Sequence, residues 1–319
     1  MGRVLVTRQL PAGGADPLVD AGVTVVGGTA RGPWTSGELA RAVEDVDGLV
    51  CLLDDQVDAA VLEAGAGGSL KVVANVAVGY DNIDVARAAS LGIVVCNTPG
   101  VLDAATADVA MLLILAGARL STDAEADLRA GRFSGWAVND YLGRDVSGAA
   151  LGLVGYGRIG RAVAQRAAGF DMTVRHHTRH PTGESGWVKS LDELLDSSDI
   201  VSLHVPLTDS TRHLIGPAEL ARMGPEAVLV NTSRGPVVDE EALAEALHAG
   251  TIYAAGLDVY EREPTVHPRL LDAPRTVLLP HIGSATTTTR TTMARLACEQ
   301  VVAVLAGRSP AHPIRPATG

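Results

Sequence analysis

The sequence has few cysteines, few aromatic residues and no long hydrophobic run. Its three cysteines, Cys51, Cys96 and Cys298, are too few and too scattered for a disulfide framework or a zinc knuckle. Three Trp, five Tyr and two Phe leave the packing of a core to Ala, Val and Leu. The longest apolar stretch, residues 110–118, is about half of the ~20 residues that span a bilayer. We therefore expect a cytoplasmic protein with no transmembrane helix, no membrane partner and no metal site.

Positive charge is also scarce. The chain has 26 Lys and Arg residues against 37 Asp and Glu, a formal net charge of −11 and an isoelectric point near 5.2. A negative surface repels phosphate backbones and anionic lipids, so we expect no nucleic-acid partner. Residues 3–7 have the composition of a strand rather than of a signal peptide. Met1-Gly2 resembles a myristoylation signal, but Val6 stands where that signal needs Ser or Thr.

What is present is a repeated alternation of short apolar runs and Ala-rich stretches. A length of 319 residues favours about two domains, and an apolar content of 47% is ordinary for a globular protein. The apolar runs are nearly continuous, which is typical of strands whose two faces are both covered by helices. Alternating strands and helices predict an α/β protein with doubly wound parallel sheets, in two Rossmann-like halves.

The alternation also predicts where the elements lie. In the first half we expect strands at about 3–7, 23–26, 48–53, 70–75 and 93–95, and helices at 17–21, 36–43, 57–64 and 84–90. A turn at residues 98–100 precedes expected helices at 104–120 and 122–130. In the second half we expect strands at 150–154, 173–177, 200–204, 228–231, 254–258 and 277–279, and a last helix at 288–305.

A glycine fingerprint lies between a predicted strand and a predicted helix at 158–168. It reads Gly155-Tyr156-Gly157-Arg158-Ile159-Gly160. In a dinucleotide-binding turn the first glycine allows the tight turn, the second lets the pyrophosphate approach the backbone, and the third lets helix and strand pack closely. The start of the helix then offers unpaired N–H groups to the phosphates. The motif predicts a dinucleotide site.

The end of the next strand bears on the choice of nucleotide. NAD sites usually carry Asp or Glu there, but this chain has Thr178, 18 residues after Gly160, and then Arg179. A carboxylate would repel a 2′-phosphate, whereas a guanidinium binds it well. We therefore favour NADP(H), with NAD(H) or a merely solvated basic strand end as the alternatives. A metal site from the neighbouring histidines is disfavoured, because adjacent strand residues point to opposite faces.

Three later segments each place polar groups just after an apolar strand. They carry Arg234, then Asp258 and Glu263, then His281. The carboxyl ends of parallel strands line one crevice, so we expect Arg234, Glu263 and His281 to converge near the nicotinamide. Taken singly, each has an ordinary alternative: a surface Arg, a solvated Glu and a structural His.

These three residue types suit the reduction of a 2-keto acid. The reaction adds a hydride to the keto carbon and a proton to its oxygen, and histidine is the natural proton donor near neutral pH. A carboxylate beside the histidine favours the protonated ring. The fork of an Arg fits the substrate carboxylate and polarises the keto oxygen.

Taken together, the motifs resemble those of the D-isomer-specific 2-hydroxyacid dehydrogenases over essentially the whole chain. The similarity to the glyoxylate/hydroxypyruvate reductase branch lies in residues 52–58 and 281–290. The matching segments, in order, are residues 75–84, 155–160, 204–208, 231–235, 256–264 and 280–286.

The resemblance implies roles for the residues of the site. His281 would be the general acid and base, Glu263 its partner, and Arg234 the substrate clamp. Backbone N–H groups of Val78 and Gly79 would bind the substrate carboxylate. Leu53 would cover the small substrate.

The resemblance also implies the cofactor contacts. Thr106 and Asp258 would lie at the nicotinamide end and Thr211 near the adenosine phosphate. Residues around the pyrophosphate and along the rest of the cofactor would be Tyr156, Arg158, Ile159, the three fingerprint glycines, Thr178, Arg179, His204, Val205, Pro206, Thr232, His281 and Gly283.

Members of the family have a cofactor domain inserted into a flavodoxin-like substrate domain. By resemblance, the substrate domain would comprise residues 1–100 and 287–319, and the NAD(P)-binding domain residues 101–286. A homodimer would form through the long helices after residue 100. Trp136 would either reach a pocket of the partner subunit or lie in the core.

Two alternatives to a glyoxylate or hydroxypyruvate reductase stay open. One is a dehydrogenase for another D-2-hydroxy acid, since pocket size cannot be read from the sequence. The other is a nucleotide-sensing, corepressor-like interaction protein on the same fold. The presence of Arg234, Glu263 and His281 argues against this second alternative.

Overall fold

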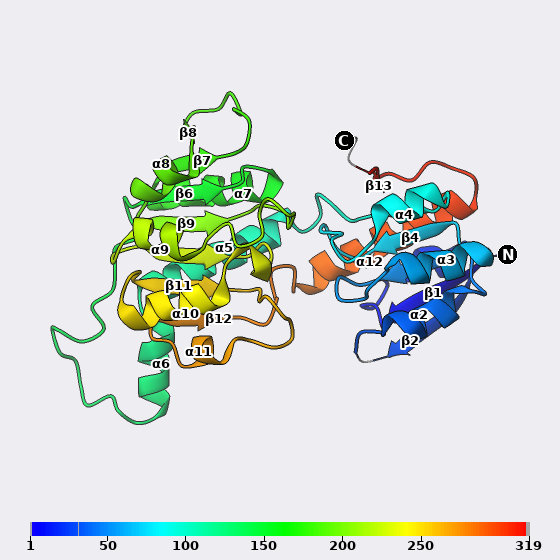
Figure 1. Ribbon diagram of the computed structural model, residues 1–319. Coiled ribbons are helices and arrows are strands. Elements are labelled where there is room, and N and C mark those ends of the chain that lie inside the picture. The colour runs from blue at the N-terminus through cyan, green and yellow to red at the C-terminus, as the bar shows by residue number, and fades with distance from the viewer. Residues whose placement is uncertain (1, 31, 317–319) are drawn as a thin grey trace. The chain divides into compact units, whose positions relative to one another are not determined.

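The computed structural model describes residues 2–30 and 32–316, which divide into two compact units (Figure 1). The first unit combines the chain up to Leu102 with the chain from Ala285 onward, and the second runs from Asp103 to Ser284. Met1 and residues 317–319, which belong to the predicted substrate domain, lie outside the described residues.

The first unit contains a six-stranded sheet in the order β13-β5-β4-β3-β1-β2. Neighbouring strands run parallel, apart from β13, which pairs antiparallel with β5. The parallel part has the flavodoxin order. The strands are β1 (Arg3–Arg8), β2 (Thr24–Ala30), β3 (Gly48–Cys51), β4 (Val72–Asn75), β5 (Val94–Cys96) and β13 (Pro313–Ile314).

Helices cover both faces of this sheet. Leu39, Leu62 and Ala88 pack from helices on one face into a cluster with β3 and β4, and α12 packs on β3, β4 and β5 with α1 beside it. Asp58 and Asp84 cap α3 and α4 by accepting backbone N–H bonds. The helices are α1 (Asp16–Asp20), α2 (Ser36–Val43), α3 (Ala59–Gly67), α4 (Val85–Ser90) and α12 (Thr287–Leu305).

The second unit contains a parallel seven-stranded sheet in the order β12-β11-β10-β9-β6-β7-β8. Counted from β6, this is the 3-2-1-4-5-6 order of dinucleotide-binding sheets with β12 added at one edge. The strands are β6 (Ala150–Val154), β7 (Thr173–His177), β8 (Trp187–Val188), β9 (Ile200–Leu203), β10 (Val228–Asn231), β11 (Ala254–Leu257) and β12 (Thr276–Leu278).

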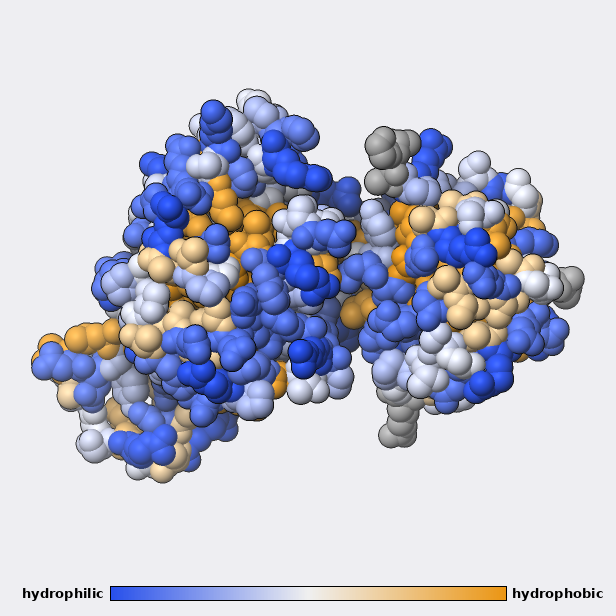
Figure 2. All heavy atoms as spheres, in the orientation of Figure 1, coloured by the Kyte–Doolittle hydropathy of each residue, from blue (hydrophilic) through white to orange (hydrophobic). Residues whose placement is uncertain are grey.

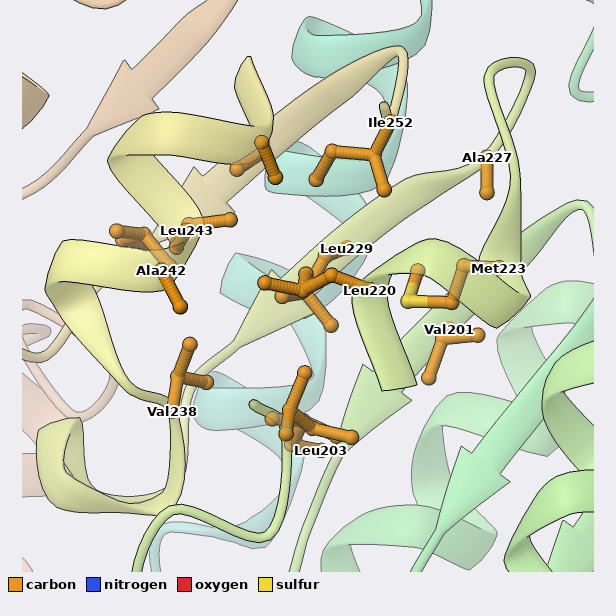
Figure 3. Packing of buried hydrophobic residues seen from close by; sticks show 14 of the residues in the cluster. Val201, Leu203, Leu220, Met223, Ala227, Leu229, Val238, Ala242, Leu243 and Ile252 are labelled. Carbon is orange, nitrogen blue, oxygen red and sulfur yellow. The ribbon is translucent and has the colours of Figure 1, made fainter. Parts of the chain in front are cut away.

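Two hydrophobic clusters lie on the two faces of this sheet, which is why its central strands β6, β9, β10 and β11 are almost continuously apolar. Leu229 of β10 points into one cluster, while Val228 and Val230 point into the other. Figure 3 shows the first cluster, where Leu220, Leu243 and other side chains of the covering helices meet the strands. The helices are α5 (Asp103–Ala118), α6 (Ser121–Arg129), α7 (Arg158–Ala167), η1 (Ala168–Phe170), α8 (Leu191–Asp196), α9 (Pro217–Met223), η2 (Gly235–Val237), α10 (Glu240–Ala249) and α11 (Pro268–Leu271).

The two-domain, doubly wound α/β prediction is confirmed, with local differences. The sequence did not predict β8 and β13, because two-residue strands carry no hydrophobic period. The helix expected to reach residue 120 ends at Ala118, since Leu120 has a left-handed φ of 53° and opens α6. The antiparallel β13 is an addition to the parallel sheet that was expected.

Within the described residues, no single helix has the length and apolar character needed to cross a membrane. Taken together, α5 and α6 are long and apolar enough to cross a membrane, but the chain bends by 68° between the two helices. Much of α5 is buried against the sheet, including Leu113 and Ile114, as expected for a core helix of a folded domain.

Candidate active site

The three fingerprint glycines differ in what surrounds them, as a dinucleotide turn requires. Gly155 has a φ of +93°, and a Cβ there would lie 2.6 Å from the carbonyl oxygen of His204. A Cβ on Gly160 would lie 2.5 Å from the carbonyl oxygen of Gly155, so helix and strand pack too closely for a side chain. A Cβ on Gly157 would meet nothing within 4 Å, which leaves its backbone open to a ligand.

The start of α7 fits a pyrophosphate. Gly157 is the N-cap residue, and as a glycine it has no side chain to accept a hydrogen bond from the first turn. The first N–H groups of a helix need acceptors, and phosphate oxygens supply them. Thr232, on the loop after β10, is buried, and its Oγ1 has no hydrogen-bond partner within residues 2–30 and 32–316. Both features fit a nicotinamide dinucleotide.

The other residues of the turn hold the start of α7 in place. Arg158 lies 3.4 Å from Asp103 (Nε to Oδ2), while the Tyr156 ring stacks on His176 with centroids 3.7 Å apart. The guanidinium of Arg161 covers the Tyr156 ring, at 5.0 Å from its centroid, and donates to the Tyr156 carbonyl at 2.7 Å. Arg161 was not among the site residues predicted from the sequence, because its position after the third glycine does not indicate a contact with Tyr156.

The end of β7 carries the residues that bear on nucleotide choice. The Thr178 hydroxyl donates to the carbonyl of His180 at 2.6 Å, which closes a tight turn. Between its ends Arg179 is exposed, with no hydrogen bond or ion pair to another described residue. The neighbouring histidines are otherwise engaged: His176 stacks on an aromatic ring, and His177 Nδ1 lies 3.2 Å from the carbonyl oxygen of Val188.

The segment after β9 contacts the glycine turn from the other side. The His204 N–H donates to the carbonyl of Val154 at 2.7 Å, and Nε2 of its ring lies 3.0 Å from Ser202 Oγ. Loss of water around the ring lowers the pKa of His204 to about 4, so it is neutral at physiological pH. Val205 lies against Gly155, and further on the Thr211 hydroxyl donates to the carbonyl of Pro206 at 2.7 Å.

His281 and Glu263 form the central pair of the site. Nδ1 of His281 lies 2.8 Å from Oε2 of Glu263, and both side chains are partly exposed. The other carboxylate oxygen of Glu263 accepts the backbone N–H of Tyr260 at 3.0 Å. This second bond fixes the carboxylate, and the carboxylate in turn orients the ring.

Asp258 ties the end of β11 to the loop that carries His281. It is buried and accepts the backbone N–H groups of Ile282 and Gly283, both at 2.7 Å. Burial raises the pKa of Asp258, and these two hydrogen bonds oppose the rise. A Cβ on Gly283 would lie 3.2 Å from Asp258 and 3.4 Å from Thr106, so Gly283 neighbours the two residues expected at the nicotinamide end.

Arg234 lies on the loop after β10, which packs against the loop after β11. Its Nη1 donates to the carbonyl of Ser233 at 2.9 Å, and its own carbonyl accepts from the side chain of Asn231 at 2.9 Å. A Cβ on Gly235 would lie 1.8 Å from the carbonyl carbon of Tyr260, so only glycine permits this contact. The loops of Arg234 and Glu263 are therefore in direct contact.

In the first unit, asparagine side chains organise the loops that carry the remaining predicted site residues. Asn97 donates to the carbonyl of Val78 at 2.7 Å, and Asn75 donates to the carbonyl of Gly79 at 2.9 Å. Asn82 accepts from Asn75 at 3.0 Å and donates to the carbonyl of Leu52 at 3.1 Å, next to the partly exposed Leu53.

These asparagines were not among the predicted site residues. A signal was present, because Asn75 ends an apolar strand and a polar group there needs a partner.

Comparisons with known proteins agree with this geometry. The family model for the D-isomer specific 2-hydroxyacid dehydrogenase, NAD binding domain, matches residues 111–283. Glyoxylate reductase from Thermococcus litoralis is 44% identical over 317 residues, which cover 97% of this chain and 95% of that protein.

Solved structures agree as well. The TT0316 protein from Thermus thermophilus matches with a TM-score of 0.92 and 44% identity, over 98% of this chain and 99% of its own. An NADPH-dependent glyoxylate/hydroxypyruvate reductase from Sinorhizobium meliloti, solved with NADP and malonate, matches with a TM-score of 0.87 and 35% identity, over 98% and 96%.

A dinucleotide turn on a parallel sheet, with a paired histidine and carboxylate after later strands, defines an NAD(P)-dependent dehydrogenase. More particularly, the chain belongs to the D-isomer specific 2-hydroxyacid dehydrogenase family, and its relatives include proteins named glyoxylate reductase. The family resemblance seen in the sequence is confirmed, and the chain is a hydroxyacid oxidoreductase that uses a nicotinamide dinucleotide.

The low pKa of His204 predicts how stability depends on pH. The folded protein keeps this ring neutral, whereas the unfolded chain takes up its proton below about pH 6.5. The contribution to the free energy of unfolding is therefore present above pH 6.5 and is lost as pH falls towards 4, by at least about 1 kcal/mol. Urea unfolding at pH 7 and pH 4.5 should show a smaller loss for His204→Gln than for the wild type.

The control for that experiment is His180→Gln, which removes an exposed imidazole. It should keep the pH dependence of the wild type. Equal pH dependence of His204→Gln and the wild type would contradict the burial effect.

Proposed function

We propose that this protein is an NADP(H)-dependent reductase of small 2-keto acids, glyoxylate or hydroxypyruvate, with His281 as the general acid. The observation that carries the proposal is the 2.8 Å hydrogen bond from His281 Nδ1 to Glu263, on loops that follow two neighbouring strands of a dinucleotide-binding sheet. The names of the relatives from Thermococcus litoralis and Sinorhizobium meliloti support this substrate class.

The cofactor is held, in this proposal, by the glycine turn and the loops around it. Gly157 and the start of α7 bind the pyrophosphate, with Tyr156, Arg158 and Ile159 around it and Thr211 near the adenosine phosphate. The remaining contacts are those expected from the family: Thr106, Thr178, Arg179, His204, Val205, Pro206, Thr232, Asp258 and Gly283. When bound, the reduced nicotinamide supplies the hydride.

The chain's own residues supply binding, orientation and the proton. His281, held through Nδ1, gives the proton on Nε2 to the keto oxygen, and Glu263 stabilises the charged ring before the transfer. Arg234 binds the substrate carboxylate and polarises the keto oxygen. Backbone N–H groups of Val78 and Gly79 bind the carboxylate as well, and Leu53 covers the substrate.

Direct measurement of turnover tests this function. Purified protein should oxidise NADPH, followed at 340 nm, when glyoxylate or hydroxypyruvate is added. His281→Ala should lower kcat by about 10²–10⁴-fold, because general acid catalysis contributes that much. His248→Ala, on α10, serves as the control and should retain the wild-type rate.

Near-normal kcat in His281→Ala would contradict the assignment of the acid. Binding of NADPH without turnover of any 2-keto acid would favour the nucleotide-sensing alternative. Turnover only of larger 2-keto acids would change the substrate and leave the reaction class in place.

The preference for NADP(H) rests on Arg179. Its exposed guanidinium, on a turn closed by Thr178, has no competing partner among the described residues, and no carboxylate stands at the end of β7. A hydrogen bond to a charged group contributes about 1.5–3 kcal/mol, or roughly 10–100-fold in affinity. Arg179→Ala should therefore lower kcat/KM for NADPH by that factor and leave kcat/KM for NADH nearly unchanged.

Lys189→Ala is the matched control, because it removes an exposed positive charge just after β8. It should leave the ratio of the two kcat/KM values unchanged. An NADH preference in the wild type, or an unchanged ratio in Arg179→Ala, would refute the role of Arg179.

We propose further that the protein is a homodimer. The segment that follows α6, residues 130–149, exposes large apolar side chains, and Figure 2 shows hydrophobic residues along it. Trp136 is 84% exposed, so the alternative of a core tryptophan is wrong. Phe133, Val138 and Leu142 are exposed beside it, which is typical of an interaction surface. We assign Trp136 to a pocket of the partner subunit.

Sedimentation velocity tests the dimer. The wild type should sediment as a dimer at micromolar concentration, and the double variant Phe133→Ser/Trp136→Ser should shift towards the monomer. A monomeric wild type would refute the proposal.

A cytoplasmic location is part of the same proposal. Cys51, Cys96 and Cys298 are unpaired and buried, and burial raises the pKa of each thiol, so they pack rather than react. Unpaired thiols are usual in a reducing compartment.

A further inference from the structure

The segment from Glu261 to His267 carries Glu263 and is attached to the start of α10 by one buried carboxylate. The backbone N–H of Glu261 donates to Oε1 of Glu240 at 2.5 Å. In the opposite direction, the backbone N–H of Glu240 donates to Oε1 of Glu261 at 3.0 Å. Glu240 is therefore joined to the start of the segment by two reciprocal hydrogen bonds.

The environment of Glu240 is unusual for a glutamate at the start of a helix. Its exposed fraction is 6%, whereas its neighbour Glu241 is exposed. Burying a carboxylate is costly unless donors satisfy it, and here the donor is the backbone N–H of Glu261, in the segment that carries Glu263. Burial raises the pKa of Glu240, and the backbone hydrogen bonds oppose that rise. If position 240 served only as the first residue of the helix, a solvent-exposed side chain would serve equally well there.

Charged groups from neighbouring loops face the same cluster. His213 Nε2 lies 3.0 Å from Oε1 of Glu261, and His213 Nδ1 lies 3.9 Å from Asp239. The His267 side chain interacts electrostatically with Glu240. The loop of His213 is also bound by its backbone, because the His213 N–H donates to the carbonyl of Pro236 at 2.8 Å.

These contacts connect the loops after three consecutive strands of the sheet. The loop after β9 contains Thr211 and His213, the loop after β10 contains Arg234, and the loop after β11 contains Glu263. Gly235 packs on the backbone of Tyr260, and Glu240 and Glu261 are joined by the two reciprocal hydrogen bonds. A displacement of Glu261 would therefore reach Glu263, two residues away, and change its bond to His281.

We propose that Glu240 is a positioning residue: its buried carboxylate fixes the segment that carries Glu263 and thereby aligns Glu263 with His281. The activity arm of the test rests on the proposed function. Glu240→Gln keeps the size of the side chain but removes the negative charge that strengthens the bond from the Glu261 N–H, and it leaves only one acceptor oxygen. This change should loosen the segment without opening a large cavity.

The experiment compares the wild type, Glu240→Gln and the exposed control Glu241→Gln as full-length proteins. In Glu240→Gln, kcat for glyoxylate should fall by about 10–100-fold, which is typical of a misplaced catalytic group. The alkaline limb of the kcat/KM profile should move to lower pH, as in Glu263→Gln, because a displaced carboxylate no longer stabilises the protonated ring of His281. The dissociation constant of NADPH should stay within about twofold of the wild-type value. Glu241→Gln should match the wild type throughout.

A second readout does not depend on turnover. The ring C–H resonances of His281, assigned with His281→Ala, should titrate at lower pH in Glu240→Gln than in the wild type. If the His281 titration and the pH profile of Glu240→Gln match those of the wild type, the proposal is overturned. This holds even if kcat and the melting temperature both fall, because those two losses alone indicate a structural role. A wild type inactive on every 2-keto acid would refute the proposed function and leave the resonance test standing.

If Glu240→Gln does not fold, Glu240→Asp provides the second variant, since it keeps both oxygens on a shorter side chain. In Glu240→Asp the His281 resonances should also titrate at lower pH than in the wild type, but by a smaller shift than in Glu240→Gln. No shift in folded Glu240→Asp would overturn the proposal.

Discussion

Parallel strands bring the residues that follow them to one edge of a sheet, and the site in the second unit depends on this constraint. The contact of Gly155 with His204 and the hydrogen bonds that Asp258 accepts from Gly283 and Glu263 from His281 each join loops after two different strands. The order and register of the sheet therefore set the distances in the site.

Within that frame, satisfied polar groups hold loops that have no regular structure. Asp258 and Glu240 are carboxylates buried at strand and helix ends, and both accept backbone N–H groups of loops that carry the central pair. In the first unit Asn75 and Asn82 hold loops by donating to backbone carbonyls, Asn75 to that of Gly79 and Asn82 to that of Leu52, next to Leu53. An unpaired polar group would be costly at these buried positions, so each arrangement favours one loop conformation.

Much of the fold could be predicted from the sequence, since apolar runs buried on both sides indicate parallel strands. The helix predicted at 36–43 coincides with α2, where Thr35 and Glu38 form a capping box that is visible in the sequence. Two-residue β8 and β13 carry no such pattern. The exposure of Trp136 could not be predicted either, because an aromatic residue in a loop is compatible with core and surface.

The sequence by itself determined the α/β class, the dinucleotide turn, the family and the residue types available for acid–base chemistry, because each is encoded in local periods and short motifs. Only the tertiary structure decided which groups touch. His281 meets Glu263 across 18 positions, and Glu240 meets Glu261 across 21. Such contacts depend on strand order, loop packing and the need of buried carboxylates for donors. These are properties of the whole folded unit, and no local stretch of sequence carries them.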